Sequence, residues 1–215
     1  MKITAIETII DLIPENSKLY FEFKFNQKNP LCLFIENEQE ITNLCLDLDN
    51  PSLVLNNEPY TCIIFKGDLN IKNIYNLNLE KAIDLMVLGN LNAENIVVGG
   101  QEIFVTGEIC IEDLFWGDQN LGILGTQSEI EAGIFVSTND YKIEHVRQQI
   151  NNDYPLIDGD DTFGEPNIDL ISKLFVPEII SLNFDKSHYG WAKFLNRQKM
   201  IENLKVNLPV VNSGC

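Results

Sequence analysis

The sequence predicts a mainly β protein: a short, right-handed, single-stranded parallel β-helix with an N-terminal β-hairpin and a C-terminal helical tail. Two observations carry this prediction. A glycine-centred motif recurs along the middle of the chain at a nearly constant interval, and apolar and polar residues alternate within each copy. A fixed period of roughly 20 residues is typical of stacked repeats, and the alternation is typical of a strand with one buried face.

Four copies of the motif define the expected β-solenoid. Their glycines are Gly67, Gly89, Gly107 and Gly125, and the first interval is longer than the two equal intervals that follow it. In the first three copies, apolar residues follow the glycine by two, four and seven positions: Leu69, Ile71 and Ile74; Leu91, Ala93 and Ile96; Ile109, Ile111 and Leu114. Each copy is therefore expected to form one coil, with like residues stacked on like and the glycine at a corner.

The fourth copy is expected to be a degraded last coil near a cap. It places Gln127 and Glu129 in slots that are apolar elsewhere, whereas an alignment slipped by one residue brings in Ser128 and Ile130. The winding also has an alternative, because a coil of about 18 residues equals three hexapeptides of a left-handed helix. The longer first interval, from Gly67 to Gly89, breaks the hexapeptide period, so the right-handed form is preferred.

Segments on either side of the repeats are expected to cover the solenoid ends. Residues 1–58 are assigned to an N-terminal cap, in which residues 19–25 (LYFEFKF) and 31–35 (LCLFI) form the hairpin. The solenoid of about four coils occupies residues 59–150. Unpaired strand edges at the ends of a solenoid invite further pairing, and a cap at each end removes them.

The chain after the solenoid divides into two parts. Residues 151–166 (NNDYPLIDGDDTFGEP) are rich in turn formers and acids, and are expected to form an acidic loop or linker. Residues 167–215 are expected to form the helical C-terminal cap. One helix ends near Val176, and a second covers residues 189–206, where apolar residues recur at helical spacing.

The net charge of −17 restricts the partners of this protein. Its 15 Lys and Arg against 32 Asp and Glu argue against nucleic acid and against an anionic membrane surface, since both need a basic patch. A basic protein partner fits, although solubility alone is the simpler explanation of such charge. The acidity lies in the part of the chain before Asp169, because six basic and four acidic side chains make up the charge from Asp169 onward.

Cysteine usage and hydropathy favour a cytoplasmic location. The five cysteines include no CxxC pair, as expected of reduced thiols. No apolar run approaches the roughly 18 residues of a membrane span. The first residues include acids and no small-residue cleavage site, so no signal peptide is expected.

No constellation of side chains indicates an enzyme. A glycine-rich phosphate loop and a GxSxG nucleophile motif are absent, and the two histidines, His145 and His188, follow the repeats. Asp158, Asp160 and Asp161 surround a glycine as calcium ligands do, but no glutamate closes the loop, so a surface loop is favoured over a metal site. We expect no catalytic residue, no cofactor and no metal.

Acidic residues on and after the repeats are the candidates for binding a partner. Trp116 joins them because tryptophan is common at interface anchors, although packing against a loop is the competing expectation. The candidates are Glu94, Glu108, Glu112, Asp113, Trp116, Asp118, Asp158, Asp160 and Asp161.

The rungs also resemble a group of small bacterial β-helix proteins described as bactofilin-like or polymer-forming cytoskeletal. The resemblance rests on VLGNLNAENIVVGGQEIFVTGEICIEDLFWGD, followed by LFVPEII and NLPVV, and covers roughly residues 60–211. Its G-[NDE]-[LI]-x-[AI] rungs are favoured by any β-solenoid. Bactofilins polymerise end to end through bare solenoid ends, and the flanking segments of this chain depart from that plan.

A toxin-associated group resembles the chain better and implies a different role. In that group a small acidic cytoplasmic protein is the immunity partner of a secreted toxin and needs no catalytic residue. The resemblance therefore implies an immunity-type protein that binds and neutralises a basic toxin domain, as a monomer or small homo-oligomer. A bactofilin-like structural polymer is the first alternative, and a carbohydrate-active or acyl-transfer enzyme is the second.

Overall fold

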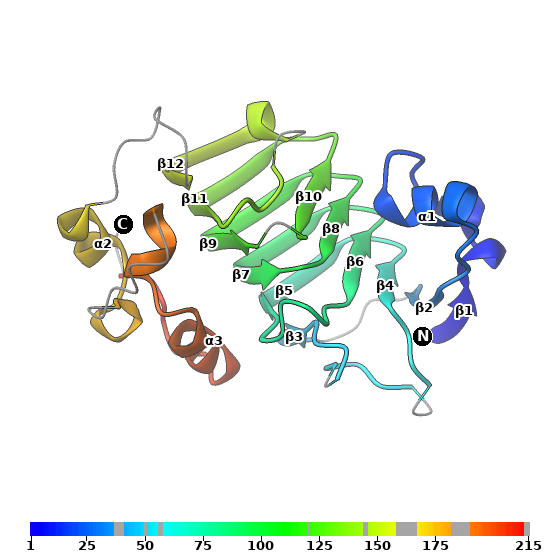
Figure 1. Ribbon diagram of the computed structural model, residues 1–215, viewed down its shortest axis with the longest axis horizontal. Helices are drawn as coiled ribbons and strands as arrows, with labels where there is room; N and C mark the ends of the chain where they lie inside the picture. The colour runs from blue at the N-terminus through cyan, green and yellow to red at the C-terminus, as the bar shows by residue number, and fades with distance from the viewer. Residues whose placement is uncertain are drawn as a thin grey trace.

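The protein is a two-sheet parallel β-solenoid flanked by helical segments (Figure 1). The computed structural model describes residues 1–36, 41–49, 51–55, 58–119, 121–143, 146–157, 167–181 and 190–212. The predicted fold class is confirmed: a mainly β solenoid of about four turns, with antiparallel strands at its N-terminal end and helices after it.

Each coil contributes one strand to each of two sheets. Sheet A has the order β1 (Lys2–Ala5), β2 (Leu31–Ile35), β4 (Cys62–Phe65), β6 (Asp84–Val87), β8 (Glu102–Val105), β10 (Ile123–Thr126). Sheet B has the order β12 (Ile150–Ile157), β11 (Ile130–Thr138), β9 (Ile109–Asp118), β7 (Leu91–Gly99), β5 (Leu69–Tyr75), β3 (Asn43–Cys45). The four predicted coils are the pairs β4–β5, β6–β7, β8–β9 and β10–β11, and the pair β2–β3 forms a shorter coil before the expected start at residue 59.

Helical segments lie on both sides of the solenoid. The α-helices are α1 (Lys18–Asn26), α2 (Ile168–Leu174) and α3 (Arg197–Lys205). Short 3-10 turns occupy Ile6–Thr8, Ile10–Leu12, Arg147–Gln149, Pro177–Ile179 and Gly190–Phe194. None of the helices in the described ranges is long and apolar enough to cross a membrane.

Like residues stack on like inside the solenoid. One ladder of Cα partners runs through sheet B from Leu69 to Leu91, Ile109, Ile130 and Ile150. All but Ile150 are buried. Burying one such side chain stabilises the folded chain by roughly 1.5–3 kcal/mol. Because a slip of one residue turns every side chain to the other face, this repeated gain sets the register.

The third copy departs from the predicted slots by one residue. The pairing of β9 with β7 contains a bulge. Between two paired positions β7 has one residue, Glu94, whereas β9 has two, Glu112 and Asp113. Phe115 therefore takes the inner slot, stacked on Phe135 with ring centroids 4.6 Å apart. Leu114, predicted to point inward, lies on the outer face of sheet B.

The fourth coil is complete, and the predicted degradation is wrong. Gly125 lies within β10 opposite Phe104, so it is not the corner residue. The corner falls at Ser128, three residues later, and Ile130 then pairs with Ile109 in the apolar slot. The glycine of the fourth motif is therefore not equivalent to Gly67, Gly89 and Gly107, because the corner residue of this coil is a serine.

The N-terminal antiparallel strands are β1 and β2, with Lys2 opposite Phe34 and Ala5 opposite Leu31. The segment predicted as a strand over residues 19–25 is instead the helix α1. Its start is capped by Ser17, whose Oγ accepts the Tyr20 N–H at 3.2 Å. A helical cap and the contacts of its first turn therefore override the alternating pattern.

The segment after the coils also differs from the prediction. Residues 150–157 form strand β12, which pairs in parallel with β11, so the first half of the expected linker over 151–166 extends sheet B. The expected single helix over 189–206 is divided. Leu195 bridges Ile180 in antiparallel fashion, and Asn196 then caps α3 by accepting the Lys199 N–H at 3.0 Å.

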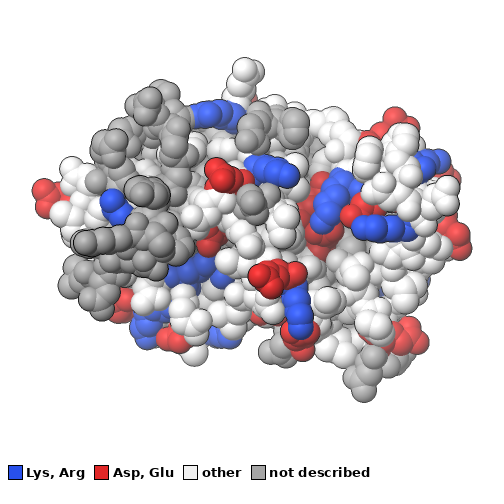
Figure 2. All heavy atoms as spheres, viewed as in Figure 1, with Lys and Arg blue, Asp and Glu red and all other residues white. Residues whose placement is uncertain are grey.

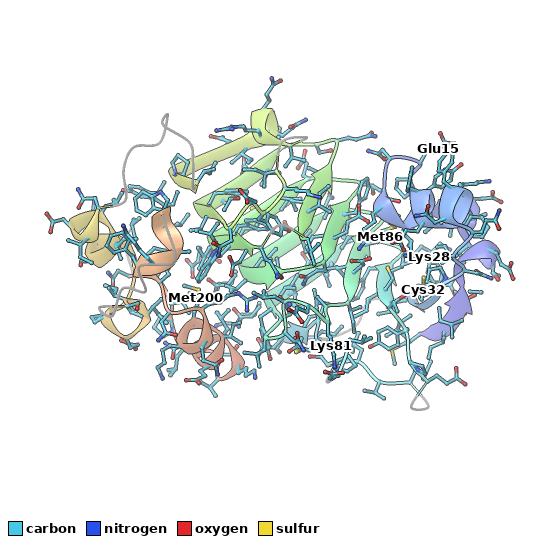
Figure 3. The ribbon with its side chains drawn as sticks, viewed as in Figure 1. Glu15, Lys28, Cys32, Lys81, Met86 and Met200 are labelled. Atoms are coloured by element: carbon cyan, nitrogen blue, oxygen red, sulfur yellow. The ribbon has the colours of Figure 1, made fainter. Side chains whose placement is uncertain are left out.

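The helical segments cover the outer faces of the two sheets, which corrects the expectation that the C-terminal tail covers an end (Figure 1). The N-terminal strand β1 does cover an end, because it pairs with the edge of β2 in sheet A. We call residues 6–26 the N-terminal cover; Ile6, Ile9 and Ile13 pack on the outer face of sheet A. We call the described residues 168–211 the C-terminal cover, which packs on the outer face of sheet B. Figure 3 shows Cys32 and Met86 toward the N-terminal cover and Met200 toward sheet B.

Loops close the two ends of the solenoid core. Leu53 and Leu55, from the loop before β4, pack against the core at one end. Ile143 and Val146 pack against it at the other. The ends of the inner core are therefore covered by loops that connect the strands, and not by the helical segments.

The corners between the sheets explain the recurrent glycine. A Cβ on Gly107 would lie 2.3 Å from Asn90 Oδ1 and 2.7 Å from Gly89 O. That Oδ1 accepts the Glu108 N–H at 3.0 Å, so each corner is tied to the next. A Cβ on Gly67, at the first corner, meets nothing within 4 Å.

We therefore expect Gly107→Ala to lower the free energy of unfolding by about 1–3 kcal/mol, since the added methyl must displace backbone. Gly67→Ala is the matched control and is expected to be neutral or slightly stabilising, because it only restricts the unfolded chain. Urea unfolding of both variants measures the difference. Equal midpoints would contradict the close stacking of corners.

Candidate partner-binding face

An exposed strip of sheet B collects the acidic side chains of four coils. It consists of the first half of β5, β7, β9 and β11 and the corner residue before each, where inward and outward side chains alternate. We call this strip the acidic face. Its carboxylates belong to Asp68, Glu94, Glu108, Glu112, Asp113, Glu129 and Glu131.

Strand register holds the side chains of this face in rows. Asn70, Asn92, Cys110 and Glu131 are successive Cα partners, and all four are exposed. Neighbouring strands lie about 4.8 Å apart. The backbones that carry neighbouring acidic side chains are thus closer than the roughly 8 Å over which physiological salt screens exposed charges. Strand register therefore gathers the acidic positions of successive coils on one strip.

Little positive charge offsets this array. Lys72 is the one basic residue at the described positions 68–72, 90–94, 108–113 and 129–133, and its Nζ lies 3.2 Å from Glu94 Oε2. Seven carboxylates and one lysine give the face a formal charge of −6 (+1 − 7). The pKa of Asp113 is raised, first by partial burial and then by the charges of Glu94 and Glu112.

The structure brings together four of the residues singled out in the sequence: Glu94, Glu108, Glu112 and Asp113. Sequence reasoning missed Asp68, Glu129 and Glu131. Asp68 directly follows a corner glycine, so the repeat already placed it. Glu129 and Glu131 were hidden because the fourth copy was aligned three residues too early.

Trp116 and Asp118 are buried, which corrects their assignment to the partner-binding set. Trp116 is 1% exposed, and its indole N–H donates to Thr138 Oγ1 at 2.8 Å. Asp118 is 6% exposed and accepts hydrogen bonds from the side chains of Thr138 and Asn139. Trp116 lies on the outer face of sheet B beneath the C-terminal cover, so neither side chain is placed to touch a partner.

Arg197 gives Asp118 a structural role. Its Nη2 donates to Asn76 Oδ1 at 3.0 Å, and its Nε lies 3.8 Å from Asp118 Oδ2. Burial lowers the pKa of Arg197 to about 10, although Asp118 and Asp47 act in the opposite direction. This buried pair joins the start of α3 to the solenoid.

The remaining candidates, Asp158, Asp160 and Asp161, lie outside the described residues, as do His145 and His188. Within the described ranges, no group of three or more His, Cys, Asp or Glu side chains is placed to hold a metal ion. A pocket of about 250 Å³ lies beside the loop before β4 and is lined by Leu48, Pro51, Val54, Glu58, Pro59 and Tyr60. Its lining offers one carboxylate and no histidine, cysteine or lysine.

Charge is distributed differently elsewhere on the molecule. On the side seen in Figure 2, Lys and Arg side chains are interspersed with Asp and Glu. One such pair is Lys81 and Asp49, whose Nζ and Oδ2 lie 3.1 Å apart. A surface of mixed sign does not favour a charged partner, so the acidic face is the stronger candidate for binding one.

Comparison with known proteins gives no match: no protein-family model, no curated protein and no solved structure resembles the chain at a significant level.

Cys110 provides a direct test of this geometry. It is exposed in the middle of the acidic face, whereas Cys32, Cys45 and Cys62 are buried. Burial also raises the pKa of Cys45 to about 11, which suppresses its thiolate. In a Cys215→Ser variant of the native protein, maleimide is expected to label Cys110 rapidly and the other three thiols at least tenfold more slowly. Mass spectrometry of peptides reads this out, and equal labelling of Cys62 and Cys110 would contradict the assigned faces.

Proposed function

We propose that this chain is a non-catalytic, immunity-type protein that binds and neutralises a basic toxin domain through the acidic face. The observation that supports the proposal is the gathering of seven carboxylates from successive coils, against a single lysine, on one strip of sheet B. The proposed partner presents lysine and arginine side chains to this strip. Toxin domains that act on nucleic acid carry such side chains, because their substrate is polyanionic.

The arrangement suits fast and selective binding. A field of one sign steers an oppositely charged partner and raises its association rate, while like-charged proteins are repelled. The hydrogen-bonded ladder fixes the backbone beneath the carboxylates, so on binding only the side chains of the face need to be ordered. A basic partner also relieves the mutual repulsion that raises the pKa of Asp113.

A bactofilin-like structural scaffold is the second candidate, and the sheet edges favour it. Among the described strands, β10 and β12 are outermost at the C-terminal end of their sheets. A parallel edge is able to pair with another chain, although the edge of β10 already pairs in part with Lys142, whose N–H donates to Gly122 O and whose carbonyl accepts the Leu124 N–H. At the opposite end of sheet A, antiparallel β1 occupies the edge of β2, which opposes the head-to-tail stacking of identical coils.

Charge reversal distinguishes binding through the acidic face from binding through the net negative charge of the whole protein. The test variant is Glu108→Lys with Glu112→Lys and Glu131→Lys, and the matched control is Glu7→Lys with Glu80→Lys and Glu178→Lys, which lie at other exposed positions. The probe is the product of the adjacent gene, purified and titrated by calorimetry. We expect the test variant to bind at least tenfold more weakly and with less salt dependence, and the control to bind as the native protein does.

Equal weakening in both triple variants would show that net charge alone matters, and unchanged binding in the test variant would overturn the assigned face. Lysozyme, a generic basic protein, serves as a second titrant and is expected to bind far more weakly than the specific partner. Sedimentation of the native protein addresses the scaffold alternative. A concentration-dependent filament would favour it and contradict the immunity proposal.

A further inference from the structure

A partly buried group of titratable side chains joins the N-terminal cover to the solenoid, with Glu102 buried, Asp84 half-buried and Lys18 at the surface. Glu102 at the start of β8 is 3% exposed, and its Oε1 accepts the backbone N–H of Lys18 at 2.8 Å. Asp84 at the start of β6 accepts the Glu102 N–H at 2.8 Å and the Lys18 Nζ at 3.0 Å. Two carboxyl groups on adjacent coils therefore hold the first residue of α1.

The charges in this group do not balance. Lys18 is the cation that contacts it, against Asp84 and Glu102, and Glu22 of α1 adds to the negative potential at Asp84. Because Glu102 is buried, a negative charge on it beside Asp84 is unfavourable, which favours one carboxyl group keeping a proton. Burial first, and then Asp84, raise the pKa of Glu102 to about 7, and burial also raises that of Asp84.

The other titratable neighbours are neutral groups. Cys62 of β4 is the Cα partner of Asp84, and Cys32 of β2 is the partner of Cys62. Hydrogen bonding to Cys32 and burial raise the pKa of the Cys62 thiol. Tyr141 belongs to the inner core of the solenoid, and its phenol pKa is raised by burial and then by Glu102 and Asp84. None of these groups supplies the missing positive charge near neutral pH.

We propose that the N-terminal cover is a proton-dependent latch: a proton held by one carboxyl group of the Asp84–Glu102 pair closes α1 onto sheet A, and its loss loosens α1 as the pH rises through neutrality. The proposal is independent of the acidic face. The latch controls access to the apolar outer face of sheet A, which includes Phe34, Ile64 and Phe104.

The packing of α1 makes local opening inexpensive. Leu19 is the one buried apolar residue of this helix and Tyr20 and Phe23 are partly buried, whereas Phe21 and Phe25 are 53% and 68% exposed. A helix with so little buried apolar area opens at lower free energy than the coils beneath it. Its attachment therefore depends strongly on the first turn, where Glu102 and Asp84 hold Lys18.

The direction of the pH effect follows from the raised pKa of Glu102. A group whose pKa is higher in the closed state stabilises that state at low pH and loses the contribution as the pH rises through the closed-state value. With that value near 7, the change falls between about pH 5 and pH 8. Closure of α1 should therefore weaken about tenfold between pH 6 and pH 8.

Hydrogen exchange of the full-length protein tests the latch. Amides of residues 18–26 are followed at pH 6 and pH 8 and corrected for intrinsic exchange. We expect their protection to fall about tenfold at pH 8 in the native protein and to be nearly independent of pH in Glu102→Gln, whose amide oxygen still accepts the Lys18 N–H. Glu108→Gln, an exposed carboxylate next to the same coil, is the control and should keep the native pH dependence.

Asp84→Asn guards against a Glu102 variant that folds poorly, because it removes one of the two carboxyl groups beside Lys18 and leaves Glu102 in place. In this variant the fall in protection of α1 between pH 6 and pH 8 should be smaller than in the native protein, because Asp84 no longer raises the pKa of Glu102 whereas burial still does. The proposal is overturned if protection in the native protein is the same at both pH values. It is equally overturned if both carboxyl variants keep the full pH dependence.

Discussion

The in-register stacking of inward-facing aliphatic side chains is the constraint on which the rest of this structure depends. The ladder from Leu69 through Leu91 and Ile109 to Ile130 places each coil on the one before it. Once this ladder forms, the strands run parallel and the corners of successive coils lie on one another. The stacking then determines how much room each corner residue has for a side chain. The close approach at Gly89 and Gly107 is one consequence, because their neighbours leave no room for a Cβ.

The same register creates the acidic face. A residue that alternates with an inward leucine or isoleucine must point outward, and stacking places it beside its equivalents on the next coils. Acidic residues that lie a whole coil apart in the chain thus become neighbours. Their repulsion is tolerated because the apolar ladder beneath them supplies more free energy than the exposed charges lose, as charges at the surface are well solvated.

The outer faces of the sheets require covers because they too are apolar. Val97, Trp116 and Val136 project from sheet B on the side opposite the solenoid core, and the C-terminal cover buries them. The N-terminal cover does the same for sheet A. Polar groups then mark where each cover is fastened: Arg197 meets Asp118 on one side, and Lys18 meets Asp84 and Glu102 on the other. The buried pair of Arg197 and Asp118 fixes the position of its cover more than it adds stability.

The sequence by itself determined the solenoid, its approximate period and the outward position of Glu94, Glu108 and Glu112, because alternation and repetition are local properties of the chain. Only the tertiary structure decided the rest. The extra residue in β9 turned Trp116 and Asp118 toward a cover, and contacts of Lys18 with distant coils helped to make residues 18–26 a helix. Which face a cover buries depends on contacts between residues far apart in the chain, and no local pattern encodes them.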